Sequence, residues 1–210
     1  MTRPLVMVAL TAVLVAGSIA PARAGAPTDQ VREYTDAVVR ILEDPALKAE
    51  DRKPERRAAV RKIAAEVFDV QETARRALGP HWQQRTPQQR EEFVQLFAEL
   101  LEQTYISKID FFGGERLRFT EEKVDGENAI VRAKVVTRQA TEVPVEARLL
   151  RKGDRWLVYD ILIENISLVG NYRAQFDRII RTQGYDELVK RLRTRGEFLR
   201  EAERPRRTER

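Results

Sequence analysis

The sequence predicts an α+β fold in which helices lie on one face of a curved antiparallel sheet of about four strands. Two changes in hydrophobic period support this prediction. Apolar residues recur every three to four positions up to about residue 109, alternate with polar residues from about 115 to 163, and then return to helical spacing. Turn residues at Asp125-Gly126 and Gly153-Asp154 separate the alternating stretches, as in a meander of hairpins.

The chain begins with the features of a secretory signal peptide. Arg3 precedes an unbroken apolar run over residues 5–16, and Ala22-Arg23-Ala24 forms a small-x-small cleavage site. The run is shorter than the roughly 20 residues that span a bilayer, which disfavours a retained anchor. We therefore expect residues 1–24 to be removed and residues 25–195 to form one periplasmic domain. A basic, flexible tail over residues 196–210 would follow it.

Composition excludes several classes of protein. Loss of Arg3 and Arg23 lowers the formal net charge from +5 to +3, and nothing interleaves basic and aromatic residues as nucleic-acid sites do. The absence of cysteine excludes thiol catalysis and cysteine-based metal sites, and His81 is the only histidine. We expect no metal, no cofactor and no nucleic acid. The arginine-rich stretch from Arg191 to Arg210 fits either anionic lipid headgroups or a solvated tail.

Two helices are expected before residue 68. Thr28 or Asp29 can cap the first, and Asp44-Pro45 ends it. Its apolar positions follow the 3.6-residue spacing of a helix face: Val31, Tyr34, Val38, Ile41 and Leu42. A second helix is expected after Asp51.

Two capping boxes mark the next helices. Asp69 with Glu72 opens a short helix, and Thr86 with Gln89 opens a longer one that has Pro87 at its first position. The longer helix is expected to run about 23 residues, to near residue 109. Its apolar face is Phe93, Leu96, Phe97, Leu100, Leu101 and Tyr105.

The strands and the last helices follow. The inward positions predicted from alternation in the two central strands are Ala129, Val131, Ala133, Val135, Val143, Val145, Ala147 and Leu149. Ser167 can cap a helix with a buried stripe at Val169, Tyr172, Phe176, Ile179 and Ile180. Asp186 is expected to cap a final helix.

Catalytic groups are scarce. Asp160 lies in an apolar strand, where burial would raise the pKa of a carboxyl and make it a base; the alternative is a structural hydrogen bond or a solvent-facing side chain. His81 lies in a loop and is more simply structural. We therefore expect no catalytic residue and no enzyme.

The predicted inner face of the sheet contains small residues, Ala129, Ala133 and Ala147, whereas the predicted facing helices carry large aromatic groups. Such a face can leave a hollow that suits a lipid. The alternative is that the aromatic side chains fill this space.

Two segments resemble one family. Residues 68–105 (FDVQETARRALGPHWQQRTPQQREEFVQLFAELLEQTY) and residues 155–180 (RWLVYDILIENISLVGNYRAQFDRII) are similar to the MlaC, or toluene-tolerance, family. The first segment matches in its Ala-Leu-Gly before Trp82, its Thr-Pro-x-Gln-Arg box and its Phe-rich helix ending in Tyr105. The second matches around Trp156 and Tyr172. Asn165 stands where many members have glycine, which leaves the local backbone geometry open.

The resemblance implies a periplasmic phospholipid carrier with a twisted antiparallel sheet and helices around an apolar cavity. Such carriers exchange lipid between an inner-membrane ABC transporter complex and an outer-membrane lipoprotein-porin complex, and so maintain outer-membrane lipid asymmetry. One branch of the family occurs with hopanoid biosynthesis, so a hopanoid stays open as the ligand. A monomer is sufficient for this role.

We expect eleven residues to line the lipid-binding cavity: Phe93, Phe97, Tyr105, Val131, Ala133, Val145, Ala147, Leu149, Val169, Tyr172 and Phe176. Two alternatives remain, an enzyme with Asp160 as base acting on an apolar substrate, and an interaction protein with a filled core.

Overall fold

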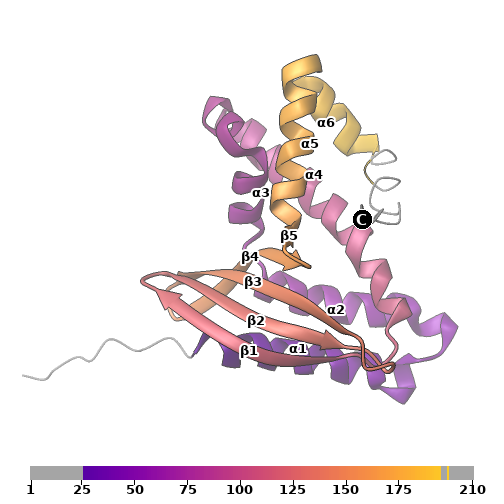
Figure 1. The fold of residues 1–210 in the computed structure, drawn as a ribbon. Coiled ribbons are helices and arrows are strands. Elements are labelled where there is room, and N and C mark those ends of the chain that lie inside the picture. Colours follow the sequence, from indigo (N-terminus) through magenta and orange to yellow (C-terminus); the bar gives the residue numbers. More distant parts are fainter. Residues whose placement is uncertain (1–25, 195–197, 199–210) are drawn as a thin grey trace, which may run out of the picture.

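The computed structural model describes residues 26–194 and Phe198. A curved sheet with two helices beneath it forms the lower part, and a group of helices stands above the sheet (Figure 1). This arrangement confirms the predicted α+β class. The expected signal peptide, residues 1–24, and all of the expected tail except Phe198 lie outside the described residues.

The first two helices are α1 (Pro27–Glu43) and α2 (Lys53–Val67), joined through the short 3-10 turns η1 (Pro45–Leu47) and η2 (Glu50–Arg52). The prediction that Thr28 or Asp29 caps α1 was wrong, because the helix begins one residue earlier with Pro27 in its first turn. Proline suits that position since it has no N–H group to leave unsatisfied. Asp29 falls in the first turn, where its negative charge interacts favourably with the positive end of the helix dipole.

The described residues form one antiparallel sheet of five strands in sequence order, β1 (Arg116–Asp125), β2 (Asn128–Val136), β3 (Glu142–Lys152), β4 (Arg155–Ile163) and β5 (Ile166–Ser167). The short β5 adds one strand to the four that alternation predicted. Glu164 and Asn165 form the tight turn before it, with φ of 51° and 64°. Asparagine tolerates this left-handed conformation better than most residues, so Asn165 takes the place of a glycine with little strain.

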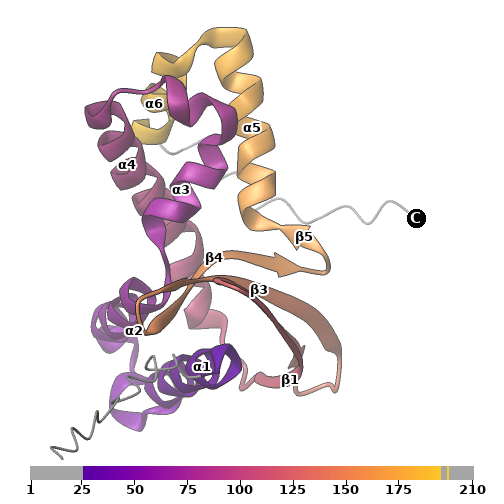
Figure 2. The same ribbon diagram turned by 90° about the vertical axis from the view of Figure 1, so that its left-hand side faces the viewer.

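The two faces of the sheet differ in chemistry. The pairs Ala133–Val145, Val131–Ala147 and Ala129–Leu149 put the apolar residues of β2 and β3 on one face, as predicted. The opposite face carries a network of ion pairs: Arg118–Glu142, Lys134–Glu142, Arg132–Glu121, Arg132–Glu146 and Arg148–Glu146. The apolar face is concave, and α1 and α2 lie beneath it (Figure 2).

The upper helices are α3 (Val70–Leu78), α4 (Pro87–Ile106), α5 (Leu168–Gln183) and α6 (Tyr185–Thr194), with 3-10 turns η3 (Gly79–Gln84) and η4 (Ser107–Phe111) flanking α4. Helix α4 is shorter than the predicted 23 residues because its last part continues as η4. Asp186 does not cap α6, as had been expected, because the helix already begins at Tyr185.

The other predicted caps are confirmed. The Thr86 N–H donates to Gln89 Oε1 at 3.0 Å, and the Gln89 N–H donates to Thr86 Oγ1 at 3.2 Å. This is a reciprocal capping box. Asp69 accepts from the N–H of Glu72, and Ser167 Oγ accepts from the N–H of Gly170. These caps fix where the upper helices start relative to the sheet.

Two apolar clusters form the core. The helical cluster joins α3, α4, α5 and α6, and also includes Phe198. The sheet cluster joins the concave face to Val31 of α1 and to Val67 and Phe68 at the end of α2. Within residues 26–194, no helix combines the length and apolar character needed to cross a membrane.

Candidate functional site

The concave face of the sheet is the candidate site, and its burial changes along the strands. The closed end consists of Ala129, Val131, Leu149, Trp156 and Val158, all of them buried in the sheet cluster. The open end consists of Leu117, Val135, Val143, Val145 and Ile163, all of them only half-buried. The register joins the open-end residues directly, through the pairs Leu117–Val135, Val135–Val143 and Val145–Ile163. Apolar surface on the concave face is therefore covered at one end and accessible at the other.

Small residues occupy the middle of this face. Ala133 is buried and pairs with Phe119 on one side and Val145 on the other, whereas Ala147 pairs with Val131 and Ile161 and is half-buried. Alanine side chains stand only one carbon above the sheet, so the middle of this face carries less side-chain volume than either end.

A groove of about 310 Å³ opens along the edge where α1 faces β1. Val39, Leu117 and Phe119 provide its apolar surface, and Phe119 also packs against the sheet cluster. A bulge between Phe119 and Glu121 shifts the register of β1 at this point. Phe119 thus lies at the junction between the groove and the concave face.

The rim of the groove is charged. Arg32, Asp36 and Arg40 follow one another at intervals of four residues on α1, so they share one side of the helix. The Arg32 guanidinium lies over the Phe119 ring, 4.4 Å from its centroid. At the end of the groove Arg116 and Glu43 form an ion pair of 2.6 Å.

The aromatic side chains of the helical cluster are closely packed on one another. Phe97 stacks on Phe93 with 5.8 Å between ring centroids and meets Phe176 and Tyr172 edge-on at 5.3 and 5.1 Å. Phe198 adds an edge-on contact to Phe176. Burial raises the pKa of Tyr172 well above its ordinary value. The aromatic side chains of α4 and α5 therefore pack mainly on one another.

The eleven residues expected to line a lipid fall in three places. Five belong to the helical cluster: Phe93, Phe97, Val169, Tyr172 and Phe176. Five lie on the concave face: Val131, Ala133, Val145, Ala147 and Leu149. Tyr105 lies near the end of α4 and is 41% exposed. Contact of these residues with a lipid stays a prediction.

Asp160, the candidate base, forms structural hydrogen bonds. It is 5% exposed, accepts from Ser167 Oγ at 2.6 Å and accepts from the N–H of Val169 at 3.0 Å. Both bonds hold the start of α5 on β4, so this arrangement agrees with the structural alternative. His81 lies 2.8 Å from Asp177 of α5, and this hydrogen bond holds the pKa of the Asp177 carboxyl below its usual range.

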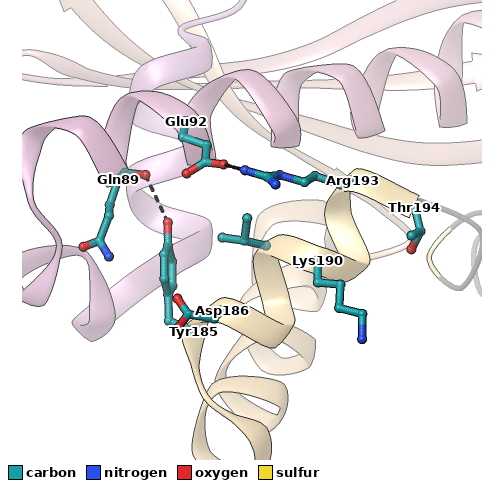
Figure 3. Close-up of a pocket in the computed structure, with 8 residues that line it drawn as sticks. Gln89, Glu92, Tyr185, Asp186, Lys190, Arg193 and Thr194 are labelled. Carbon is teal, nitrogen blue, oxygen red and sulfur yellow. Dashed lines mark hydrogen bonds and ion pairs between the residues drawn. The ribbon is translucent and has the colours of Figure 1, made fainter.

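Another hollow of about 450 Å³ lies between α4 and α6 (Figure 3). Its residues are mainly polar: Tyr185 donates to the backbone oxygen of Gln89 at 3.0 Å, and Arg193 pairs with Glu92. Burial raises the pKa of Tyr185 to about 12. Among the described residues, no group of His, Asp and Glu side chains is arranged to hold a metal ion.

Comparison with known proteins agrees with this architecture. The sequence profile of the MlaC protein family matches residues 32–194. This chain belongs to the MlaC family. The match spans α1 to α6 and thus both the concave face and the helical cluster.

Two proteins that are similar to this chain are informative. The intermembrane phospholipid transport system binding protein MlaC of Haemophilus influenzae is 26% identical over 141 residues. That alignment covers 65% of this chain and 66% of the relative, slightly less than two thirds of its length. A solved phospholipid-binding protein from Ralstonia solanacearum, in complex with a phospholipid, superposes with a TM-score of 0.71 at 25% identity, covering 83% of this chain and 99% of that one.

Sequence reasoning missed the contribution of α1 to this candidate MlaC-family site. It predicted α4 and α5 as the helices that face the sheet, whereas α1 and α2 cover the concave face. Arg32, Val39 and Phe119, which line the groove, were not among the expected site residues. The apolar stripe of α1 was the available signal, because a helix with one apolar side must bury it against another element.

Proposed function

We propose that this protein is a periplasmic carrier that binds a phospholipid by its acyl chains. The observation that carries the proposal is the concave face, which is apolar throughout and accessible at its open end. The Ralstonia solanacearum protein, which has the same fold, holds a phospholipid. Family membership supports lipid transport as the process in which the chain takes part.

The physical need for such a carrier is large. Each methylene moved from an apolar environment into water costs about 0.8 kcal/mol, so two chains of about 15 methylenes cost about 24 kcal/mol to expose. An unaided lipid therefore crosses an aqueous compartment very slowly. A carrier that also releases its cargo needs an apolar surface that resembles the bilayer, and such a surface requires no catalytic residue.

We place the acyl chains along the concave face, in contact with Val131, Ala133, Val145, Ala147 and Leu149. Tyr105, near the end of α4, would lie at the margin of this site. Separation of α1 from β1 would widen the groove and admit a second chain. The upper helices would keep their packing during this movement.

The cellular role follows from this chemistry. We propose that the signal peptide exports the chain to the periplasm. There it would move lipid as a monomer between an inner-membrane ABC transporter complex and an outer-membrane lipoprotein-porin complex, and so maintain outer-membrane asymmetry. A hopanoid is the alternative cargo of the same site. The hydrogen bonds of Asp160 favour a carrier over an enzyme because they give that carboxylate a structural task.

Native mass spectrometry of the exported protein, purified without detergent, tests the proposal. We expect an added mass equal to a phospholipid, and a hopanoid mass would assign the alternative cargo. Ala133→Trp and Ala147→Trp should each fill the concave face and lower lipid occupancy at least tenfold while the protein stays folded. Ala65→Trp, on the exposed side of α2, is the matched control.

Circular dichroism separates loss of fold from loss of binding. Unchanged occupancy in both concave-face variants would contradict the assigned location. A wild-type protein that stays free of lipid after incubation with phospholipid vesicles would contradict the carrier itself.

A further inference from the structure

The groove between α1 and β1 contains three charges that are not neutralised by other side chains. Among the described residues, Arg32, Asp36 and Arg40 form no salt bridge and no side-chain hydrogen bond. The remaining two charges of the groove, Arg116 and Glu43, neutralise each other. The free charges therefore alternate along α1 as positive, negative and positive.

The absence of pairing between Arg32 and Asp36 has a local cause. Residues four apart on a helix are close enough to form an ion pair. The Arg32 guanidinium instead lies over Phe119, where the ring face attracts a cation. Phe119 thus holds Arg32 at the boundary between the charged rim and the apolar face, and leaves its N–H groups available to a ligand.

We infer that this groove is a headgroup site for a zwitterionic phospholipid. The phosphodiester would accept hydrogen bonds from Arg32 and Arg40, and Asp36 would face the ammonium group. Guanidinium groups suit phosphate because their N–H donors match two phosphate oxygens at once. The inference rests on the proposed lipid-carrier function and specifies which headgroup that carrier prefers.

The connection between the groove and the concave face supports this assignment. Phe119 and Val31 both pack against the sheet cluster, and Phe119 and Leu117 both line the groove. A lipid with its chains on the concave face would carry its glycerol past these side chains. Its phosphate would then lie between the side chains of Arg32 and Arg40, whose backbones are about two helical turns apart, and Asp36 would face the ammonium group from the same side of α1.

Competitive loading tests the inference. Protein is incubated with vesicles containing equal amounts of phosphatidylethanolamine, phosphatidylglycerol and diacylglycerol with identical acyl chains, and native mass spectrometry then measures the bound fraction of each. For the wild type we expect phosphatidylethanolamine to exceed diacylglycerol about tenfold. The double variant Arg32→Met, Arg40→Met should reduce this preference to about twofold or less and retain diacylglycerol.

The single variant Asp36→Asn should shift the ratio of bound phosphatidylethanolamine to phosphatidylglycerol at least threefold toward the anionic lipid. Arg178→Met removes an exposed arginine of α5 outside the groove, and its ratios should match those of the wild type. Inorganic phosphate at about 10-fold excess over lipid should leave the wild-type ratios unchanged, since the site recognises phosphate as part of a lipid.

The outcomes are distinguishable. If the groove variants bind lipid with wild-type ratios, the headgroup site is wrong while the carrier function stands. If inorganic phosphate abolishes the preference for phosphatidylethanolamine over diacylglycerol, the groove is a free-phosphate site. The lipid assignment is then overturned. If the wild type binds none of the three lipids, the proposed function itself fails.

Discussion

The helical cluster and the open end of the sheet are both apolar, but they differ in how completely their side chains are covered. Phe93 and Phe97 are fully buried against neighbouring rings, whereas Val143 and Val145 keep part of their surface accessible. Buried apolar area stabilises the fold in proportion to its extent. The helical cluster therefore supplies stability, and the open end leaves apolar surface for a ligand.

This difference has a mechanical consequence. A close-packed cluster does not deform continuously, because small changes in volume already lose contacts. An incompletely covered face can admit a guest without breaking existing contacts. We therefore expect lipid binding to change the distance between α1 and the sheet more than the packing of α4 on α5.

Removal of a ring from the helical cluster should have the largest effect. Phe97→Ala should lower the free energy of unfolding by about 4 kcal/mol, since it loses buried area and leaves a cavity among three other aromatic side chains. Urea denaturation followed by circular dichroism measures this change. Phe111→Ala is the matched control, because Phe111 is 81% exposed and its loss should change stability by less than about 0.5 kcal/mol. Equal effects of the two substitutions would remove the distinction between the regions.

The two ends of the concave face should respond differently to truncation. Leu149→Ala, at the closed end, should cost about 3 kcal/mol of stability, whereas Val143→Ala, at the open end, should cost less than about 1 kcal/mol. Val143→Ala should nevertheless change lipid occupancy, which native mass spectrometry reports. A stability loss at Val143 as large as that at Leu149 would show that the open end is a closed core.

Weakening the hydrogen bonds of Asp160, which join the sheet to the start of α5, should have a smaller effect on stability than truncation of Phe97 or Leu149. Asp160→Asn keeps the size of the side chain but loses the charge that accepts from Ser167 and Val169, so stability should fall by about 1.5 kcal/mol. Lipid transfer between donor and acceptor vesicles should stay within about twofold of the wild-type rate. Abolished turnover of an apolar substrate with normal stability would instead support the enzyme alternative.

Local features of the fold could be predicted because short-range chemistry determines them. The Thr86 and Gln89 capping box needs only residues three apart, and the inward position of Ala133 follows from the alternation of a strand. The sequence segments around Trp82 and Tyr172 are also sufficient to indicate the family. These signals are contained within single elements.

The composition of the site could not be predicted in the same way. The stripe that contains Phe93 and Phe97 showed that α4 buries one side, but a stripe does not specify which element covers it. The same applies to α1, whose apolar side could have packed on any helix. Partner choice depends on contacts between segments far apart in sequence, such as Arg32 over Phe119.

The first strand has a consequence for how copies of this chain behave toward one another. Within the described part of the sheet β1 has a neighbour only on the β2 side, so its outer backbone groups could pair with a strand of another molecule. Charged side chains and a bulge interrupt that edge at Arg118, Glu121 and Lys123. Such an edge opposes strand-by-strand polymerisation, and a chain that exposes apolar surface at high local concentration can therefore remain as separate molecules.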